Sequence, residues 1–516
     1  MHFQGVFCGL TSQSFEIVKL VRSQGFRRVS ISPGKLSSTF MLTGVCCSDI
    51  IARTSPLRPS ALSQVGPFFL KLAFSRRFTM KRVRILPVMV SLVALFFCAD
   101  VAQAQFLTVG CAGGDPSAQF SDINSALLNV TGPGAFLLIT GTCTENVFLN
   151  RANNLTLGAP SGTTANLNGH LSIQNSLNVY LSGLNVTNNS GTGIDVTSGH
   201  SVTLDTCSSS GNAGNGMSVQ QGSDVSVVNV GTFSNNRGEG IFVATNSVVN
   251  IGSFGGTTEI SNNQSSGVGV DRSVFEAFGT HIAGNGQAAI NSLGAGKTLI
   301  FSFSGVNPTV IENNANGGVS LQEGSEISIG TVLPSGPNLI SNNGPFGISA
   351  GFGSQVTLVG AVITGHTGPG VDIYGHSQLN GTSQISGLGA TQISDNGTAG
   401  DPLSAGIRVD GISEAMLRGV TISQNAGPAI LALVNSSVDF AGNTFSGNAG
   451  VITCDSTSSM VSDLPKPART PAAGVSCITA HMLGNRRESD SAPAVPDVSA
   501  GKKLHSDYQQ RSASKK

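Results

Sequence analysis

The side chains best able to do chemistry are Asp372, Tyr374, His376, Arg408 and Asp410. The repeat described below puts Asp372 and Arg408 at equivalent positions, so they should be neighbours on the outer face of a sheet, with Tyr374 beside Asp410. A carboxylate beside a guanidinium could act as an acid or a base in cleaving a polymer. The same pair also fits a surface ion pair. We favour the ion pair and keep the five residues as catalytic candidates.

No second group of residues favours an enzyme. Glycoside hydrolysis needs two carboxylates that flank the scissile bond, and no Asp-Asp pair occurs in this chain. The cysteines and histidines show no metal-ligand spacing, so we predict no metal and no cofactor. Between residues 189 and 450 the bases are scattered over distant repeats, at Arg237, Arg272, Lys297, Arg408 and Arg418.

A column of asparagines recurs at steps of 22 to 30 residues and organises most of the chain. Five residues after nine of these positions comes an apolar residue, from Ile194 to Ile430. After Asn396 the matching residue is Ile407, which indicates a six-residue insertion. Asparagines stacked at one corner can bond to one another and tolerate left-handed backbone. We predict such a ladder at Asn189, Asn212, Asn236, Asn263, Asn285, Asn314, Asn343, His366, Asn396, Asn425 and Asn448.

Each repeat also holds a serine followed by alternating apolar residues, as in Ser223-Asp224-Val225-Ser226-Val227. That period of two is typical of a strand with one buried face. One repeat cannot bury its apolar face alone, so the repeats must stack into a continuous core. Helical repeats do not fit this alternation or the 66 glycines.

These columns resemble the right-handed parallel β-helix repeats of the pectin-lyase-like superfamily, over residues 106–455. The resemblance implies an all-β, single-stranded solenoid of about 11 rungs. Residues 120–127 resemble the short helix that caps the N-terminal end in that superfamily, and residues 139–147 resemble its approach to the first rung. Lyases of the superfamily use a basic residue and bind calcium, so calcium is expected only if the chain is a lyase. Gly365-His366-Thr367-Gly368 faintly resembles an element of its hydrolases, but His366 also holds a ladder position.

The chain reads as four segments. Residues 80–104 have a basic start at Met80, a short apolar run and the cleavage pattern Ala102-Gln103-Ala104, which is typical of a secretory signal peptide. Residues 1–79 are then a spurious or unstructured extension, with a long unusual leader as the alternative. Residues 105–455 form the β-helix, and residues 456–516 form a low-complexity, disordered tail. We expect a secreted, periplasmic or cell-surface protein with no transmembrane segment in the mature chain.

Five cysteines remain after cleavage. In an exported protein, Cys111 with Cys143 and Cys454 with Cys477 would staple the two ends of the repeats. Cys207 lies among the repeats and is read as a buried apolar residue.

The charge of the repeat region limits the partners. Between residues 106 and 450 there are 19 acidic and 6 basic side chains, a net charge near −13. An acidic body is a poor partner for nucleic acid or polyanionic glycans, so we expect no nucleic acid.

We predict an exported, non-catalytic scaffold with surface, adhesive or glycan-binding function. The alternative is a carbohydrate-active enzyme, a polysaccharide lyase or glycoside hydrolase, that uses the Asp372/Arg408 region. Insertions near residues 252–259, 302–309, 330–338 and 381–391 should collect along one edge, either as a binding edge or as drift at a tolerant corner. The aromatic residues there are Phe254 and Phe303.

Overall fold

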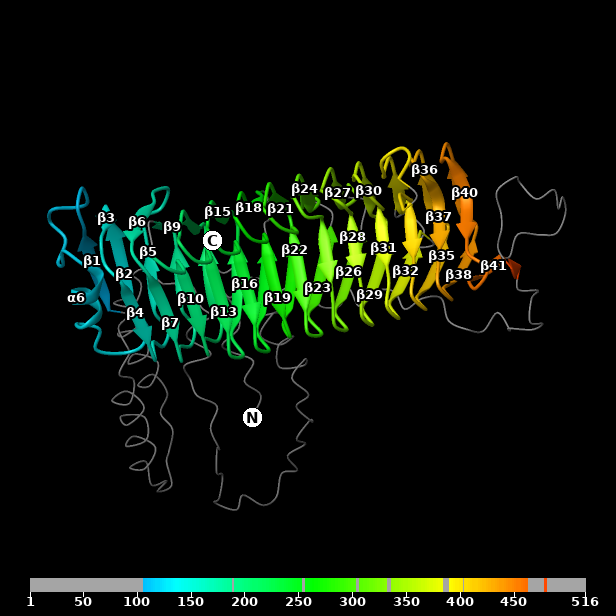
Figure 1. The fold of residues 1–516 in the computed structure, drawn as a ribbon. Coiled ribbons are helices and arrows are strands. Elements are labelled where there is room, and N and C mark those ends of the chain that lie inside the picture. Colours follow the sequence, from blue (N-terminus) through cyan, green and yellow to red (C-terminus); the bar gives the residue numbers. More distant parts are fainter. Residues whose placement is uncertain are drawn as a thin grey trace, which may run out of the picture. The chain divides into compact units, whose positions relative to one another are not determined.

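The chain folds into three long parallel sheets that run side by side (Figure 1). The structure is a computed structural model, and it describes residues 105–187, 190–252, 256–302, 306–331, 336–383, 389–401, 403–462 and 478–479. Successive strands along the chain enter the three sheets in turn, and every pairing is parallel. This is a right-handed parallel β-helix.

Sheet A has 16 strands. Its strands alternate between buried and outward residues, as in Val225 and Val227, which are buried between Asp224 and Ser226. In stacking order the strands are β1 (Phe106–Gly110), β2 (Phe136–Thr140), β5 (Thr156–Gly158), β8 (Tyr180–Ser182), β11 (Val202–Asp205), β14 (Asp224–Val228), β17 (Val248–Gly252), β20 (Val274–Phe278), β23 (Lys297–Ser302), β26 (Glu326–Thr331), β29 (Gln355–Val359), β32 (Gln378–Thr382), β35 (Glu414–Arg418), β38 (Ser437–Ala441), β41 (Ser459–Ser462) and β42 (Ile478–Thr479).

Sheet B has 13 short strands, and its strands precede the asparagine corner. In order they are β3 (Thr142–Cys143), β6 (Ala165–Asn168), β9 (Leu184–Thr187), β12 (Ser208–Ser210), β15 (Thr232–Ser234), β18 (Thr258–Ser261), β21 (Thr280–Ala283), β24 (Val310–Glu312), β27 (Leu339–Ser341), β30 (Val362–Thr364), β33 (Gln392–Ser394), β36 (Thr421–Ser423) and β39 (Thr444–Ser446).

Sheet C also has 13 strands and carries the apolar column that follows each asparagine. In order they are β4 (Val147–Asn150), β7 (Leu171–Gln174), β10 (Ile194–Thr197), β13 (Met217–Gln220), β16 (Ile241–Ala244), β19 (Val268–Asp271), β22 (Ile290–Leu293), β25 (Val319–Leu321), β28 (Ile348–Ala350), β31 (Val371–Ile373), β34 (Ile407–Val409), β37 (Pro428–Ala432) and β40 (Gly450–Cys454).

The predicted asparagine ladder is present at the corner between sheets B and C. The Asn236 Nδ2–H donates to Oδ1 of Asn263 at 2.9 Å, and the Asn263 Nδ2–H donates to Oδ1 of Asn285 at 3.0 Å. From Asn212 to Asn425, each asparagine backbone N–H also donates to the ladder side chain of the next rung, as from Asn236 to Asn263 at 3.1 Å. The ladder residues from Asn212 to Asn425 are buried, so these bonds satisfy polar groups that water cannot reach. Asn189 lies outside the described residues.

A second ladder, which we did not predict, runs along the corner between sheets C and A. The Ser354 N–H donates to Oγ of Ser377 at 3.1 Å, and the Ser377 N–H donates to Oγ of Ser413 at 3.2 Å. The Ser354 hydroxyl donates back to the Gly351 carbonyl at 2.6 Å. All three serines are buried. The serine column seen in the sequence therefore ties rungs together and does not merely begin a strand. We call this turn the serine corner.

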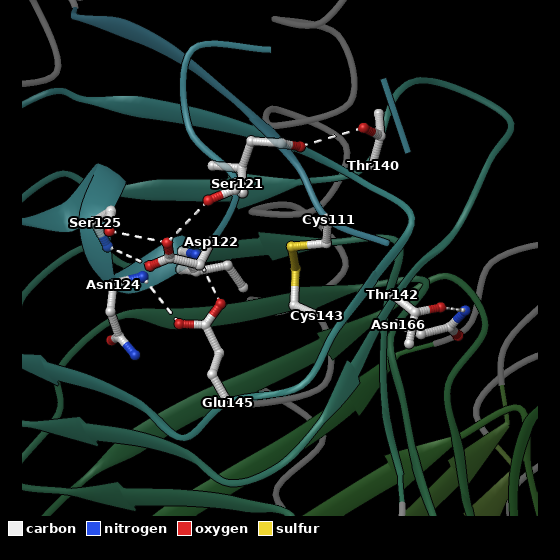
Figure 2. Close-up of a disulfide and its surroundings, with 12 residues drawn as sticks. Cys111, Ser121, Asp122, Asn124, Ser125, Thr140, Thr142, Cys143, Glu145 and Asn166 are labelled. Atoms are coloured by element: carbon white, nitrogen blue, oxygen red, sulfur yellow. Dashed lines mark hydrogen bonds between the residues drawn. A yellow bond between two sulfur atoms is a disulfide. The ribbon is translucent and has the colours of Figure 1, made fainter. Parts of the chain in front are cut away.

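The predicted capping helix is α6 (Ile123–Leu127), which lies at the first rung. Asp122 caps it through the Ser125 N–H at 2.7 Å, and the carboxylate of Glu145 accepts from the Ile123 and Asn124 N–H groups at 2.7 and 3.0 Å (Figure 2). Acidic groups at a helix N-terminus satisfy its unpaired N–H donors. Beside this cap, Cys111 and Cys143 form the expected disulfide.

The structure corrects two predictions, the number of rungs and the C-terminal end of the β-helix. The number of rungs is 13 rather than about 11, because Asn146 and His170 lie directly before β4 and β7, so the offset of five residues is missing from the first two rungs. At the other end, β41 pairs with β38, and β42 pairs with β41, so sheet A continues beyond residue 455.

Residues 1–104, which include the predicted signal peptide, lie outside the described ranges. In the part that the structure describes, no helix is long and apolar enough to cross a membrane.

Candidate functional site

Asp372 and Arg408, two of the five catalytic candidates that we call the predicted patch, lie side by side on adjacent strands. Asp372 of β31 is in register with Arg408 of β34. The guanidinium donates two hydrogen bonds to the carboxylate, from Nε to Oδ1 at 2.7 Å and from Nη2 to Oδ2 at 2.8 Å. The side chains are only 10% and 20% exposed, so this is a largely desolvated pair rather than the exposed pair that the sequence indicated.

Burial and pairing act on Asp372 in opposite directions. Burial raises the pKa of the Asp372 carboxyl, and the guanidinium of Arg408 opposes that rise. The nearby Asp410 charge raises it further. A bidentate arginine holds a carboxylate in a fixed geometry and uses its acceptor oxygens. The guanidinium therefore holds both oxygens of the carboxylate in place, and the two charges largely cancel.

The other three predicted residues form no hydrogen bond to this pair in the part of the chain that the structure describes. The ring of Tyr374 lies over Gly351, where an added Cβ would come within 2.4 Å of it, and meets Phe352 edge to face at a centroid distance of 5.6 Å. The Asp410 N–H donates to the Ile373 carbonyl at 2.8 Å. His376 lies on the serine corner with φ of 64° and is exposed.

A charged cluster that the sequence reasoning missed crosses three strands of sheet B. The His281 ring on β21 contacts Glu259 of β18 through Nδ1 at 2.9 Å and Glu312 of β24 through Nε2 at 3.2 Å. The two carboxylates therefore flank the ring from the strands on either side of β21. The signal was present, because Glu259 and His281 each precede an isoleucine of the repeat by one residue.

Sheet A carries a third charged region. Lys297 of β23 and Glu326 of β26 are in register, with the ammonium 3.9 Å from the carboxylate. They line a shallow hollow of about 420 Å³ together with Arg272. Burial raises the pKa of Glu276 on β20, and the charge of Lys297 lowers it. This carboxyl is half-buried and was not singled out from the sequence.

The expected insertions follow β17, β23, β26 and β32, which are all strands of sheet A, so they do lie along one edge. Each includes residues outside the described ranges, among them Phe254 and Phe303.

Metal-ligand spacing occurs once in the described parts of the chain, at Cys111, Cys143 and Glu145. The two sulfurs are joined in the disulfide, and the carboxylate of Glu145 caps α6. These three groups therefore have structural roles that leave neither sulfur as a thiolate ligand for a metal. Cys454 is also disulfide-bonded, but Cys477 lies outside the described residues, so its predicted pairing stays a prediction.

Comparison with known proteins agrees with this architecture. Residues 121–253 match the family described as "Right handed beta helix region". No curated protein matches the sequence.

Similar solved structures include pectate lyase Pel9A, with 14% identity, 54% of this chain and 76% of that chain covered, and a TM-score of 0.34. The A-module of the mannuronan C-5 epimerase AlgE6 from Azotobacter vinelandii is 16% identical, with 73% of this chain and 95% of that chain covered and a TM-score of 0.36. The A-module of AlgE4 from the same organism is 17% identical, with 70% and 92% covered and a TM-score of 0.35.

Proposed function

We propose that this protein is an exported β-helix scaffold that binds glycans on its outer surface without transforming them. The observation that carries this proposal is the Asp372–Arg408 pair. A catalytic base must be free to take a proton at the reacting atom. Here both carboxylate oxygens accept from the guanidinium, at 2.7 and 2.8 Å.

The rest of the architecture supports a scaffold. The asparagine and serine ladders tie each rung to the next through buried bonds, as between Asn263 and Asn285 and between Ser354 and Ser377. A stack of rungs held in this way presents an extended and preformed surface. A preformed surface loses little conformational entropy when it binds an extended polymer.

Export is proposed from residues 80–104 alone, whose basic start and apolar run fit a signal peptide. N-terminal sequencing of the protein recovered outside the cytoplasm should begin at Gln105. Retention of residues 80–104 in the recovered protein would contradict export by this route.

A product assay tests whether the scaffold is catalytic. The purified protein is incubated with neutral and acidic polysaccharides, with and without calcium, and reducing ends and unsaturated products are measured. The expected result is binding with no product from a protein that circular dichroism shows to be folded as β-structure. Product from any substrate would refute the proposal.

A second candidate function, a glycan-cleaving enzyme, rests on one observation. Burial raises the pKa of Glu276, and a raised pKa is what the general acid of a glycosidase requires. The neighbouring Asp224 contributes to the same rise. If product forms, Glu276→Gln should abolish it under this candidate, whereas Asp372→Ala with Arg408→Ala should abolish it if the predicted patch is the active site.

A further inference from the structure

The serine corner carries three large apolar side chains in a backbone conformation that disfavours them. The two residues before each corner serine commonly have positive φ. In earlier rungs polar residues hold these places, such as Gln221 at 58° and Glu323 at 57°. In later rungs the residues are Phe352 at 55°, Ile412 at 63° and Val434 at 52°. For β-branched residues such as Ile412 and Val434, this conformation is a genuine outlier.

Packing against the core does not explain why Phe352, Ile412 and Val434 occupy these positions. Phe352, Ile412 and Val434 are 61%, 53% and 51% exposed. Each therefore combines an unfavourable backbone with an unfavourable contact between apolar surface and water. Backbone strain that the surrounding packing does not require points to a role in binding.

The three side chains lie on one edge within four consecutive rungs. They belong to the turns that lead from β28 to β29, from β34 to β35 and from β37 to β38, and the turn of the rung between the first two holds His376. Rungs stack about 4.8 Å apart, close to the length of one pyranose unit in an extended chain. Tyr374 packs its ring edge to face against Phe352 and extends this surface. We call Phe352, Tyr374, Ile412 and Val434 the apolar ridge.

Acidic groups border the apolar ridge. Asp410 and Glu414 lie two residues to either side of Ile412, and Asp455 accepts from the Val434 N–H at 2.6 Å. The nearby Arg408 is already paired with an aspartate. This border disfavours a polyanion or an anionic membrane, and it would also repel the same ridge on a second copy of the chain.

We propose that the apolar ridge binds a neutral polysaccharide that lies extended along the stack of rungs. The apolar faces of its sugar rings contact Phe352, Ile412 and Val434, and its hydroxyls donate to the carboxylates of Asp410 and Glu414. This assignment rests on the proposed glycan-binding function and adds the site and the class of glycan.

The test uses the full chain and the triple variant Phe352→Asn, Ile412→Asn and Val434→Asn. Asparagine tolerates left-handed backbone, so the variant should fold and keep the melting temperature of the wild type or exceed it. The matched control is Phe148→Thr, since Phe148 is also 61% exposed but lies in β4, far from the apolar ridge in the order of rungs.

Binding is measured by affinity electrophoresis in gels that contain a soluble β-glucan, a mannan, polygalacturonate or alginate. The wild type and Phe148→Thr should be retarded by a neutral glycan, and the triple variant should bind at least tenfold more weakly. Unchanged retardation of the folded triple variant would refute the ridge assignment while leaving glycan binding intact. Retardation by the polyuronates alone would refute the assignment to neutral glycans. A wild type that no glycan retards would overturn the proposed function as well, and a dimer that only the triple variant loses would assign the ridge to self-association.

Discussion

Acid should weaken the protein at one rung of the asparagine ladder, where His366 replaces asparagine. The Asn343 N–H donates to Nδ1 of His366 at 3.2 Å, and in the tautomer that accepts this bond Nε2 donates to the Ile340 carbonyl at 3.2 Å. The ring is buried, and burial lowers the pKa of His366 from 6.5 to about 4. A protonated ring could not accept from Asn343.

The sign of the pH effect follows from this shift. Because the folded-state pKa lies below the unfolded one, the unfolded chain binds the proton more tightly. Stability is therefore complete above the unfolded pKa of 6.5 and falls as the pH decreases towards about 4. The full shift of the pKa corresponds to about 3 kcal/mol in the free energy of unfolding. At pH 5 the protein should already have lost about 2 kcal/mol of that free energy.

The assay is urea unfolding of the wild type and of His366→Asn at pH 7.5 and pH 5. Asparagine restores the ladder and does not titrate, so the variant should gain about 2 kcal/mol relative to the wild type between the two pH values. Carboxyl titrations are common to both proteins and cancel in this difference. The control is His200→Asn, which makes the same change at an exposed position. A difference between the wild type and His366→Asn that does not vary with pH would refute the reasoning.

Three further predictions concern stability and are checked by urea unfolding. Asn263→Ala should lower the free energy of unfolding by about 3 kcal/mol, because two donors of Asn236 and the Phe233 carbonyl, all in the preceding rung, lose their buried partners. Unchanged stability of this variant would contradict a ladder that holds the rungs together. Arg408→Ala should lower the free energy of unfolding by about 3 kcal/mol, because it leaves the desolvated carboxylate of Asp372 without its partner. Adding Asp372→Ala should recover most of that loss. No recovery would point to a packing role for the arginine. Reducing the Cys111–Cys143 disulfide should cost about 3 kcal/mol, and an unchanged midpoint under reductant would contradict its role as a staple.

Much of the fold could be predicted because a β-helix repeats locally. The alternation in Ser223-Asp224-Val225-Ser226-Val227 sets which residues face the core, and β14 buries Val225 and Val227 accordingly. The regular asparagine steps predicted the ladder before any contact was known. The prediction missed two rungs where the corner takes a different turn, at Asn146 and His170, because the strand follows these residues directly and the five-residue offset of the later rungs is missing.

The candidate site was less predictable, because it depends on side chains of other rungs. The sequence indicated that Asp372 and Arg408 would be neighbours, since register follows from the repeat. It could not show that their pair would be largely desolvated, and it did not reveal the contacts of His281 with two glutamates in the flanking strands.

The sequence by itself therefore determined the β-helix, the asparagine ladder and the acidic charge of the body, because composition and period are properties of the chain. Only the tertiary structure decided which charges are buried and paired, and which apolar residues stay exposed on left-handed backbone, as at Ile412 and Val434. The physical reason is that burial and pairing depend on atoms from rungs 20 or more residues away in the chain, as for Asp372 and Arg408, which are 36 positions apart.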